Sequence, residues 1–289
     1  MKNIKTIHIG KRLLILSLLI FKYYTFSQTN FWEQIPPPFG GNITSFTVNE
    51  NNYYFVGVKD KGIFRSFNQG YSWQPIGLFN TTITALNIKN NILFAGSENY
   101  GIFSSSDNGE SWQLLNSNLI GEKINSIEFY NNLLLIGTDN GLFSCNINGS
   151  NLTQITNGIP NIGIRSIKVN NSGNIFLATN NGCYYSNSNL VFQALNNGLN
   201  SLNLYTIEIS PENDIFLGGE EGVYKLNNNT WQRIDTNKNF KNIKSILITN
   251  NNQIYIANEK LFFSADSGKT FNEIISDTLN IKQIKKDKF

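Results

Sequence analysis

The sequence predicts an all-β fold: a β-propeller of four-stranded antiparallel blades, with six complete blades and the remnants of a seventh. The main observation is a repeat whose successive starts lie 40, 41, 40, 40, 39 and 38 residues apart, which is the length of a propeller blade. A second observation is that apolar residues follow the spacing of short strands between Asn-rich turns, and no repeat has helical spacing. The repeats start at Ile43, Ile83, Ile124, Ile164, Leu204, Ile243 and Ile281.

Each repeat contains the pattern of four strands, and the second strand always holds a small residue at the same place. We expect this residue where strands or blades approach too closely for a larger side chain. One repeat cannot bury both faces of its sheet, so the repeats must stack, and closing them into a ring removes the exposed ends. The small residues are Gly57, Gly96, Gly137, Ala178, Gly218 and Ala257.

The sequence is compatible with two different numbers of blades. An extra fourth strand is expected at Trp32 and an extra first strand at Ile281, and these could only be the outer and inner edges of a seventh blade. Either six blades close by themselves with spare ends, or a seven-bladed ring contains one deficient blade. We expect six full blades plus remnants.

An eight-residue motif, S-x-D-x-G-x-S/T-W, lies between the third and fourth strands of several repeats. Its Asp or Asn can accept backbone N–H groups, its Gly supplies a positive φ, and its hydroxyls tie the ends of a tight turn. The closing aromatic is large enough to pack against a neighbouring repeat. The three best copies are Ser66, Asn68, Gly70 and Trp73; Ser105, Asp107, Gly109 and Trp112; and Ser264, Asp266, Gly268 and Phe271.

This motif resembles the Asp-box, or bacterial neuraminidase repeat, of β-propellers. The resemblance implies a structural turn on the face away from the ligand, so we expect these motifs to have an architectural role. The segment Leu135–Phe143 is similar to the repeats of two-component-regulator sensor propellers. A role like that of the Asp-box photosystem assembly factors is a further implication, although their arginine-lined patch is not evident in this sequence.

Residues 1–27 are expected to be a cleaved secretory signal, followed by a propeller over residues 28–289. Lys2, Lys5, Lys11 and Arg12 precede the apolar run 13–21, which is too short to span a bilayer. The segment carries five of the 23 basic residues and none of the 20 acidic ones, so the mature chain has a net charge of 18 − 20 = −2. That charge gives no support to nucleic-acid binding, and no membrane insertion is expected after cleavage.

The composition excludes several kinds of catalytic and metal site. The single histidine is His8, inside the expected signal, which excludes Ser-His-Asp and Cys-His catalysis and His-bearing zinc sites in the mature chain. Cys145 and Cys183 alone cannot form a thiolate metal site, and they are expected either as buried free thiols or as a disulfide. We therefore expect no catalytic residues of these types, no metal and no cofactor.

In a propeller, the turns between second and third strands surround the mouth of the central channel, which is the default binding face. In five of the six repeats these turns carry carboxylates, and Tyr100, Phe39 and Phe240 could add rings beside them. We hypothesise that this face binds a cation-bearing or polyhydroxylated ligand; the alternative is that the turns are chosen for local geometry alone. The predicted ligand-binding residues are Asp60, Glu98, Tyr100, Asp139, Glu220, Glu221 and Glu259.

An enzyme is the main alternative to a binding module. Sialidases hold the substrate carboxylate with three arginines, but Arg65 and Arg233 fall in outer strands and cannot converge with Arg165 on the channel. A glycosidase with two carboxylates roughly 5 to 10 Å apart stays open, although xyloglucanases with Asp-boxes clamp two propellers over their substrate and this chain has one. We expect a secreted or periplasmic, monomeric, non-catalytic module that binds carbohydrate or protein; a glycoside hydrolase and a sensor or assembly-factor propeller are the alternatives.

Overall fold

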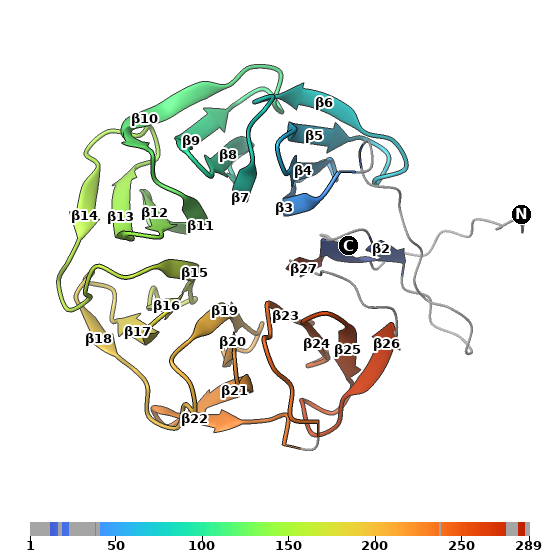
Figure 1. Cartoon of the computed structure of the whole chain (residues 1–289), viewed down its shortest axis with the longest axis vertical. Helices are drawn as coiled ribbons and strands as arrows, with labels where there is room; N and C mark the ends of the chain where they lie inside the picture. Colours follow the sequence, from blue (N-terminus) through green and yellow to red (C-terminus); the bar gives the residue numbers. More distant parts are fainter. Residues whose placement is uncertain are drawn as a thin grey trace, which may run out of the picture.

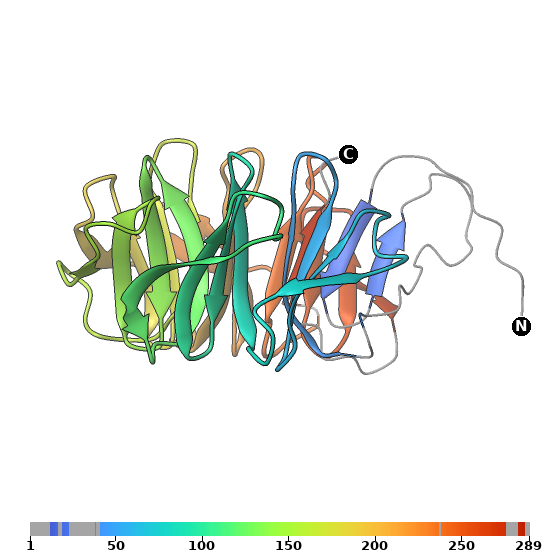
Figure 2. The same cartoon turned by 90° about the horizontal axis from the view of Figure 1, so that it is seen from above.

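The computed structural model describes residues 12–16, 19–22, 38, 41–236, 238–275 and 283–286. Six four-stranded antiparallel sheets stand around a central axis as the blades of a propeller, and the described residues contain no α-helix (Figure 1). Seen from the side, the strands of each blade run across the thickness of a flat ring (Figure 2). The all-β propeller fold and its four-stranded blades are as the sequence predicts.

The strands of each blade follow one another from the centre of the ring to its edge (Figure 1). The first three blades are β3 (Ile43–Val48), β4 (Tyr54–Val58), β5 (Gly62–Ser66) and β6 (Gln74–Gly77); β7 (Ile83–Lys89), β8 (Ile92–Ser97), β9 (Tyr100–Ser105) and β10 (Gln113–Ile120); and β11 (Ile124–Tyr130), β12 (Leu133–Thr138), β13 (Gly141–Asn146) and β14 (Thr153–Ile155). The last three are β15 (Ile164–Val169), β16 (Ile175–Thr179), β17 (Gly182–Ser186) and β18 (Phe192–Ala194); β19 (Leu204–Ile209), β20 (Ile215–Gly219), β21 (Gly222–Asn227) and β22 (Thr230–Arg233); and β23 (Ser245–Ile248), β24 (Ile254–Ala257), β25 (Leu261–Ser264) and β26 (Asn272–Ile275).

A three-stranded sheet occupies the place between the sixth and first blades. Its inner strand, β27 (Gln283–Lys286), contacts β23 and β3 and pairs with β1 (Arg12–Leu16), which in turn pairs with β2 (Leu19–Lys22). The inner remnant of a seventh blade, expected around Ile281, is therefore present two residues later. Trp32, the expected outer remnant, lies outside the described residues, and β1 and β2 come from the expected signal segment.

Neighbouring blades approach each other closely at the small residue of the second strand. A Cβ atom on Gly96 would lie 2.4 Å from Ile124 Cγ2, and one on Gly137 would lie 2.8 Å from Ile164 Cγ2. Neither glycine has a positive φ, so the requirement here is for space and not for an unusual backbone. Gly57 and Gly218 meet Ile83 and Ile243 in the same way.

Ala178 is one of two alanines at this position, with Ala257, and its neighbour differs from those of the glycines. The next blade begins there with Leu204, whose side chain is not branched at Cβ, whereas the glycines face isoleucine. Ala178 and Leu204 are both buried in one apolar cluster. The residue on the second strand is therefore matched to the shape of the residue that starts the next blade.

Each of the first five inner strands contains a β-bulge after its first residue. The pairing shifts between Ile43 and Ser45, for example, and at the corresponding places in β7, β11, β15 and β19. The bulge breaks the ordinary alternation of a strand, so that apolar residues three apart are both buried while the two between them turn towards the axis. Ile164 and Ile167 are buried in this way, and Arg165 and Ser166 line the centre.

The eight-residue motif forms a closed network of hydrogen bonds. In the second blade the Ser105 hydroxyl donates to Asp107 Oδ1 at 2.7 Å and accepts the Gly109 N–H at 2.8 Å. Asp107 also accepts the N–H and the hydroxyl of Ser111, at 3.0 and 2.6 Å. Gly109 has a φ of 90°, and the turns that start at Ser66 and Ser264 repeat these bonds.

The aromatic residue that closes a motif or starts a fourth strand attaches its blade to the preceding one. Trp112 Nε1 donates to the carbonyl of Ile76 at 2.8 Å, and Trp231 Nε1 donates to the carbonyl of Leu195 at 2.7 Å. Phe271 instead packs edge-on against Phe240, with ring centroids 5.4 Å apart. The outer strands are therefore joined from blade to blade, as the size of these side chains predicts.

The structure also bears on two further expectations from the sequence, which concern the cysteines and membrane-spanning helices. Cys145 and Cys183 are both free and buried, and burial raises the pKa of Cys145 to about 11, so they form no disulfide. Within the described ranges, no helix has the length and apolarity needed to cross a bilayer.

The contact between Gly96 and Ile124 gives a test of blade packing. Gly96→Ala should lower the free energy of unfolding by about 1 to 3 kcal/mol, because the added methyl group is forced against a β-branched neighbour. Adding Ile124→Leu should recover part of this loss, since the pair then matches Ala178 and Leu204. Thermal and urea unfolding of both single variants and the double variant measures the coupling; purely additive effects would show that the two residues do not limit each other.

The turn at Ser264 gives a test by pH. The hydroxyl and N–H of Thr270 lower the pKa of Asp266 to about 2 from its usual 3.8. A carboxylate with a lowered folded pKa contributes stability above pH 4, and that contribution is lost as the pH falls through about 2. The melting temperature of Asp266→Asn should therefore fall less than that of the wild type between about pH 5 and pH 2.5.

Asn68 holds the corresponding turn of the first blade, where its Oδ1 accepts the N–H of Ser72 and its Nδ2 donates to the Ser72 hydroxyl. Asp266→Asn should therefore also keep near-native stability at neutral pH. Asp266→Ala, the matched variant without a polar group, should melt at a lower temperature at neutral pH. An equal acid response in the wild type and Asp266→Asn would contradict this explanation of the turn.

Candidate functional site

The centre of the ring is a polar cavity of about 490 Å³ that is lined by all six inner strands and by β27. Because of the bulges, most of the residues that line it form three levels along the axis. Six apolar residues also border it: Leu86, Ile127, Ile167, Ile207, Ile246 and Ile284. We call the three levels the mouth level, the hydroxyl level and the floor level. The mouth level is Thr44, Thr84, Asn125, Arg165, Tyr205 and Lys244; the hydroxyl level is Ser45, Ala85, Ser126, Ser166, Thr206, Ser245 and Gln283; the floor level is Asn87, Glu128, Lys168, Glu208 and Leu247.

Most side chains of the mouth level join one blade to the next. Asn125 Nδ2 donates to the carbonyl of Ile164 at 3.2 Å, and Arg165 Nη1 donates to the carbonyl of Leu204 at 3.0 Å. Thr44 and Thr84 make the same bond to Ile83 and Ile124. In each of these four blades a side chain thus reaches the first carbonyl of the following inner strand.

Arg165 is held rigidly at the mouth. Its Nη1 also donates to Asn203 Oδ1 at 2.7 Å, and its guanidinium lies 4.8 Å from the ring centroid of Tyr205. The Tyr205 hydroxyl in turn contacts Asn242 Oδ1 at 3.3 Å. No carboxylate within the described residues pairs with Arg165, so its charge is oriented but not neutralised.

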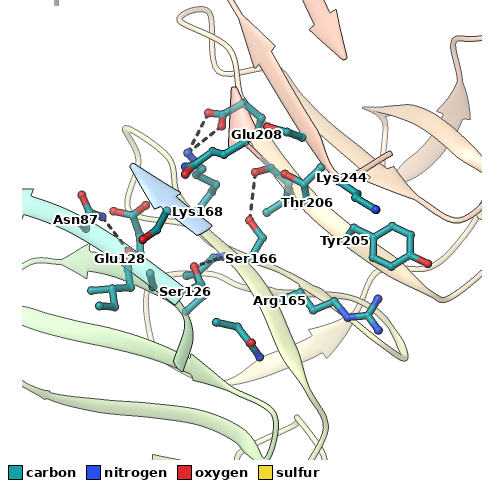
Figure 3. Close-up of a pocket in the computed structure, with 18 of the residues that line it drawn as sticks. Asn87, Ser126, Glu128, Arg165, Ser166, Lys168, Tyr205, Thr206, Glu208 and Lys244 are labelled. Carbon is teal, nitrogen blue, oxygen red and sulfur yellow. Dashed lines mark hydrogen bonds and ion pairs between the residues drawn. The ribbon is translucent and has the colours of Figure 1, made fainter. Parts of the chain in front are cut away.

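The hydroxyls of the hydroxyl level make bonds between blades, among them Ser166 Oγ, which donates to the carbonyl of Ile207 at 3.5 Å. Ser126 Oγ accepts the N–H of Ile167 at 3.2 Å, and Ser245 Oγ accepts the N–H of Ile284 at 2.8 Å. The Ser245 bond attaches β27 to the sixth blade. Ser166 and Thr206 are half-buried and face the cavity, where Figure 3 shows them between the charged residues of the mouth and floor.

The floor level carries a cation between two carboxylates on neighbouring inner strands. Lys168 Nζ lies 2.9 Å from Glu208 Oε2, and Glu128 comes from the strand on the other side (Figure 3). Burial acts to lower the pKa of Lys168, but Glu208 and Glu128 raise it above its usual value. The side chains of Lys168 and Glu208 are only 31% and 23% exposed, so solvent screens this pair little.

The predicted carboxylates lie on the turns around the mouth, outside the lining of the cavity. Asp139 accepts a hydrogen bond at 2.7 Å from Asn125 of the mouth level, and Asp60 accepts one at 2.8 Å from Thr82. Glu220 accepts a bond from Ser201 and Glu221 pairs with Lys241. Glu98 is half-buried and Glu259 is exposed. The structure thus brings Asp139 nearest to the cavity lining and leaves the others at separate points of the rim.

The predicted aromatic residues of this face have different positions. Tyr100 is 53% exposed, as a ligand-contacting ring must be. Phe240 is only 6% exposed and packs against Phe262 and Phe271, so the prediction that it borders the site is wrong. Its sequence neighbours are polar, and nothing in them shows that the loop before β23 fills the core. Phe39 lies outside the described residues.

The three arginines considered for a carboxylate site have different positions and partners. Arg65 is buried in β5, where its Nη1 donates to the carbonyl of Asn108 and its Nη2 pairs with Glu110, both in the next blade. Arg233 pairs with the buried Asp235. Arg165 alone lines the cavity, so the arrangement of three converging arginines does not form.

Most of the cavity lining was missed by sequence reasoning. The signal that identifies it is the I-x-S-I pattern of the inner strands, because two apolar residues three apart cannot lie on one side of a regular strand. A bulge is required, and it turns the two intervening residues towards the axis. Counted from the first residue of each repeat, the second residue belongs to the mouth level, the third to the hydroxyl level and the fifth to the floor level.

Chemically, the cavity offers hydroxyl, amide, ammonium, guanidinium and carboxylate groups and little apolar surface. Over the described parts of the chain, no group of three or more His, Cys, Asp and Glu side chains could hold a metal ion. Such a lining suits a ligand that is itself rich in hydrogen-bonding groups.

Comparisons with known proteins support the fold. No family model matches the sequence, and no curated protein matches it significantly. The extracellular domain of the putative one component system BT4673 from B. thetaiotaomicron is similar in structure, with 17% identity and a TM-score of 0.73 over 92% of this chain and 37% of that chain. YCF48 bound to D1 peptide has 14% identity and a TM-score of 0.68, over 88% of this chain and 86% of that one.

An ancestral GH74 enzyme has 17% identity and a TM-score of 0.67, and the match covers 87% of this chain and 42% of that one. The chain thus spans less than half the length of the BT4673 domain and of the GH74 enzyme. At these identities the likeness shows the fold alone. It confirms, at the level of the fold, the resemblance to sensor, assembly-factor and glycosidase propellers.

The Lys168 cluster gives a test of the floor level. Lys168→Met removes the cation and leaves Glu128 and Glu208 facing each other, so we expect the free energy of unfolding at pH 7 to fall by about 1 to 3 kcal/mol. The loss should shrink near pH 4, where carboxylates become protonated. Chemical unfolding at both pH values measures it, with Lys269→Met on an exposed turn as the control; an equal loss at both pH values would mean that charge is not the cause.

Proposed function

We propose that this chain is a secreted or periplasmic, non-catalytic β-propeller that binds a polar ligand in its central cavity. The observation that carries this proposal is the lining: polar side chains from the inner strands face one 490 Å³ space. That volume is within the usual range for a small-molecule site, roughly 300 to 1,000 Å³. The residues around it are fixed by bonds between blades, so the site is formed before a ligand arrives.

The chemistry of the lining favours carbohydrate over an apolar ligand. Hydroxyls of Ser166 and Thr206, the amide of Asn87 and the carboxylates of Glu128 and Glu208 can exchange hydrogen bonds with sugar hydroxyls. Tyr205 adds a ring at the mouth. A protein partner is the alternative, and the solved complex of YCF48 with a D1 peptide shows that one propeller of this shape binds a peptide.

The floor level favours binding over glycoside hydrolysis. A glycosidase needs one carboxyl group that can donate a proton and a second group that acts as a base or nucleophile. In this cavity Lys168 pairs with Glu208 and is also close enough to Glu128 to be affected by its charge. Glu208 is therefore held in an ion pair with Lys168, and an ion-paired carboxylate is suited to accepting hydrogen bonds from a ligand.

We propose a location outside the cytoplasm because the first 27 residues have the pattern of a secretory signal. The extracellular origin of the BT4673 domain is consistent with a propeller that works outside the cytoplasm. Cleavage after residue 27 would remove β1 and β2 and leave β27 as the single strand between the sixth and first blades. Sequencing the N-terminus of the exported protein tests this boundary, and an intact Met1 would contradict it.

The proposed site is tested by filling the cavity. Ser166→Phe places a large ring in the hydroxyl level, so it should reduce binding of any cavity ligand by at least about 100-fold, an effect near 3 kcal/mol. The matched rim variant Glu98→Gln with Glu259→Gln removes two rim charges and should leave binding unchanged. Oligosaccharide arrays followed by calorimetry on the purified protein give the affinities.

Two outcomes would contradict the proposal. If the rim variant loses binding and Ser166→Phe keeps it, the ligand binds on the turns and the original hypothesis for Asp60, Asp139 and their neighbours is favoured. If a retained oligosaccharide is hydrolysed, and Glu128→Gln or Glu208→Gln abolishes the hydrolysis, the protein is an enzyme.

A further inference from the structure

The mouth of the cavity carries two positive charges that the fold itself does not neutralise. Arg165 donates to an amide and a carbonyl oxygen but not to a carboxylate. Lys244 is half-buried and immediately precedes β23, the inner strand of the sixth blade, and no bond of its side chain is found in the described part of the chain. In Figure 3 both side chains extend towards the same end of the cavity as Tyr205.

Lys168, the cation at the floor of the cavity, differs from these two because carboxylates lie beside it. Lys168 pairs with Glu208 and is raised in pKa by two carboxylates. The cation of the floor is therefore paired with a carboxylate, whereas the two cations of the mouth are not. The anionic end of a ligand is consequently attracted to the mouth.

The fixed guanidinium of Arg165 also keeps donors available for an oxyanion. Asn203 and Leu204 hold Nη1 of Arg165, which leaves Nε and Nη2 as donors on a guanidinium that is already fixed against Tyr205. A fixed guanidinium binds a carboxylate with little loss of side-chain entropy. Lys244 lies two blades from Arg165, on the other side of Tyr205, and can add a charge-assisted bond to the same ligand across the mouth.

We propose that the ligand of this cavity is an acidic saccharide, with its carboxylate held between Arg165 and Lys244 and its hydroxyls directed towards Ser166, Thr206 and the carboxylates of the floor. This inference rests on the proposed function and specifies the ligand class of the same site. A saccharide fits better than an acidic peptide, because the lining below the mouth is more polar than apolar and offers hydroxyl, amide and carboxylate groups to sugar hydroxyls.

The experiment compares matched sugars. Trisaccharides of galacturonate, glucuronate or N-acetylneuraminate are titrated into the purified protein by calorimetry, each beside the neutral trisaccharide that lacks the carboxylate. An acidic sugar should bind at least about tenfold more tightly than its neutral counterpart, and high salt should reduce this preference because the mouth is open to solvent. An acidic tripeptide serves as a carboxylate that is not a sugar.

Lys244→Gln is the key variant, since its side chain supports no contact between blades. It should reduce the preference for the acidic sugar by about five- to tenfold and leave the affinity for the neutral sugar unchanged. Lys269→Gln, an exposed lysine on the turn that starts at Ser264, is the matched control and should change neither. Arg165→Lys should weaken acidic binding further, because an ammonium cannot keep the guanidinium's bonds.

The outcomes separate this inference from the proposed function. If neutral sugars bind as tightly as acidic ones and Ser166→Phe abolishes both, the cavity binds sugars but the mouth does not select carboxylates, and only this inference is overturned. If the acidic tripeptide binds as tightly as the acidic sugars, the saccharide class is wrong. If no sugar binds, the inference and the sugar-binding proposal both fail.

Discussion

The structure depends on how closely one blade can approach the next at the inner strands. At four of the junctions between blades an isoleucine near the start of the next inner strand lies over a glycine of the preceding blade, with no room for a Cβ atom at Gly57, Gly96, Gly137 or Gly218. This approach brings mouth-level side chains within reach of the next strand's first carbonyl, as Asn125 and Arg165 show. Packing and hydrogen bonding therefore reinforce each other around the ring.

The same constraint creates the candidate site. Two apolar residues three apart must both be buried between blades, and the β-bulge that allows this turns the two residues between them to the axis. Those two residues are not part of the apolar packing between blades, so their identity is free to vary from blade to blade. Threonine and asparagine there close the ring, whereas Arg165, Tyr205 and Lys244 give one side of the mouth a chemical character of its own.

Fold and site differ in how far the sequence alone predicts them. The blades follow from the spacing of strands such as those starting at Ile83 and Ile124, and the small residue at Gly96 anticipates close blade packing. The cavity was harder to predict, because the bulge changes which side chains share a face and a regular alternation misplaces Arg165 and Ser166. Phe240 was assigned to the surface because burial of a loop aromatic depends on tertiary packing against Phe262 and Phe271. Carboxylates such as Glu98 were conspicuous in the sequence, yet the cavity lies inside their ring.

The central claim is that the inner strands, and not the surrounding turns, receive the ligand. Hydrogen–deuterium exchange with and without a bound oligosaccharide tests this directly, because backbone amides near a ligand become protected. We predict increased protection in β11, β15, β19 and β23, whose residues supply the charged and hydroxyl groups of the cavity. Protection confined to the turns that carry Asp60, Glu98 and Glu259, with the inner strands unchanged, would contradict it.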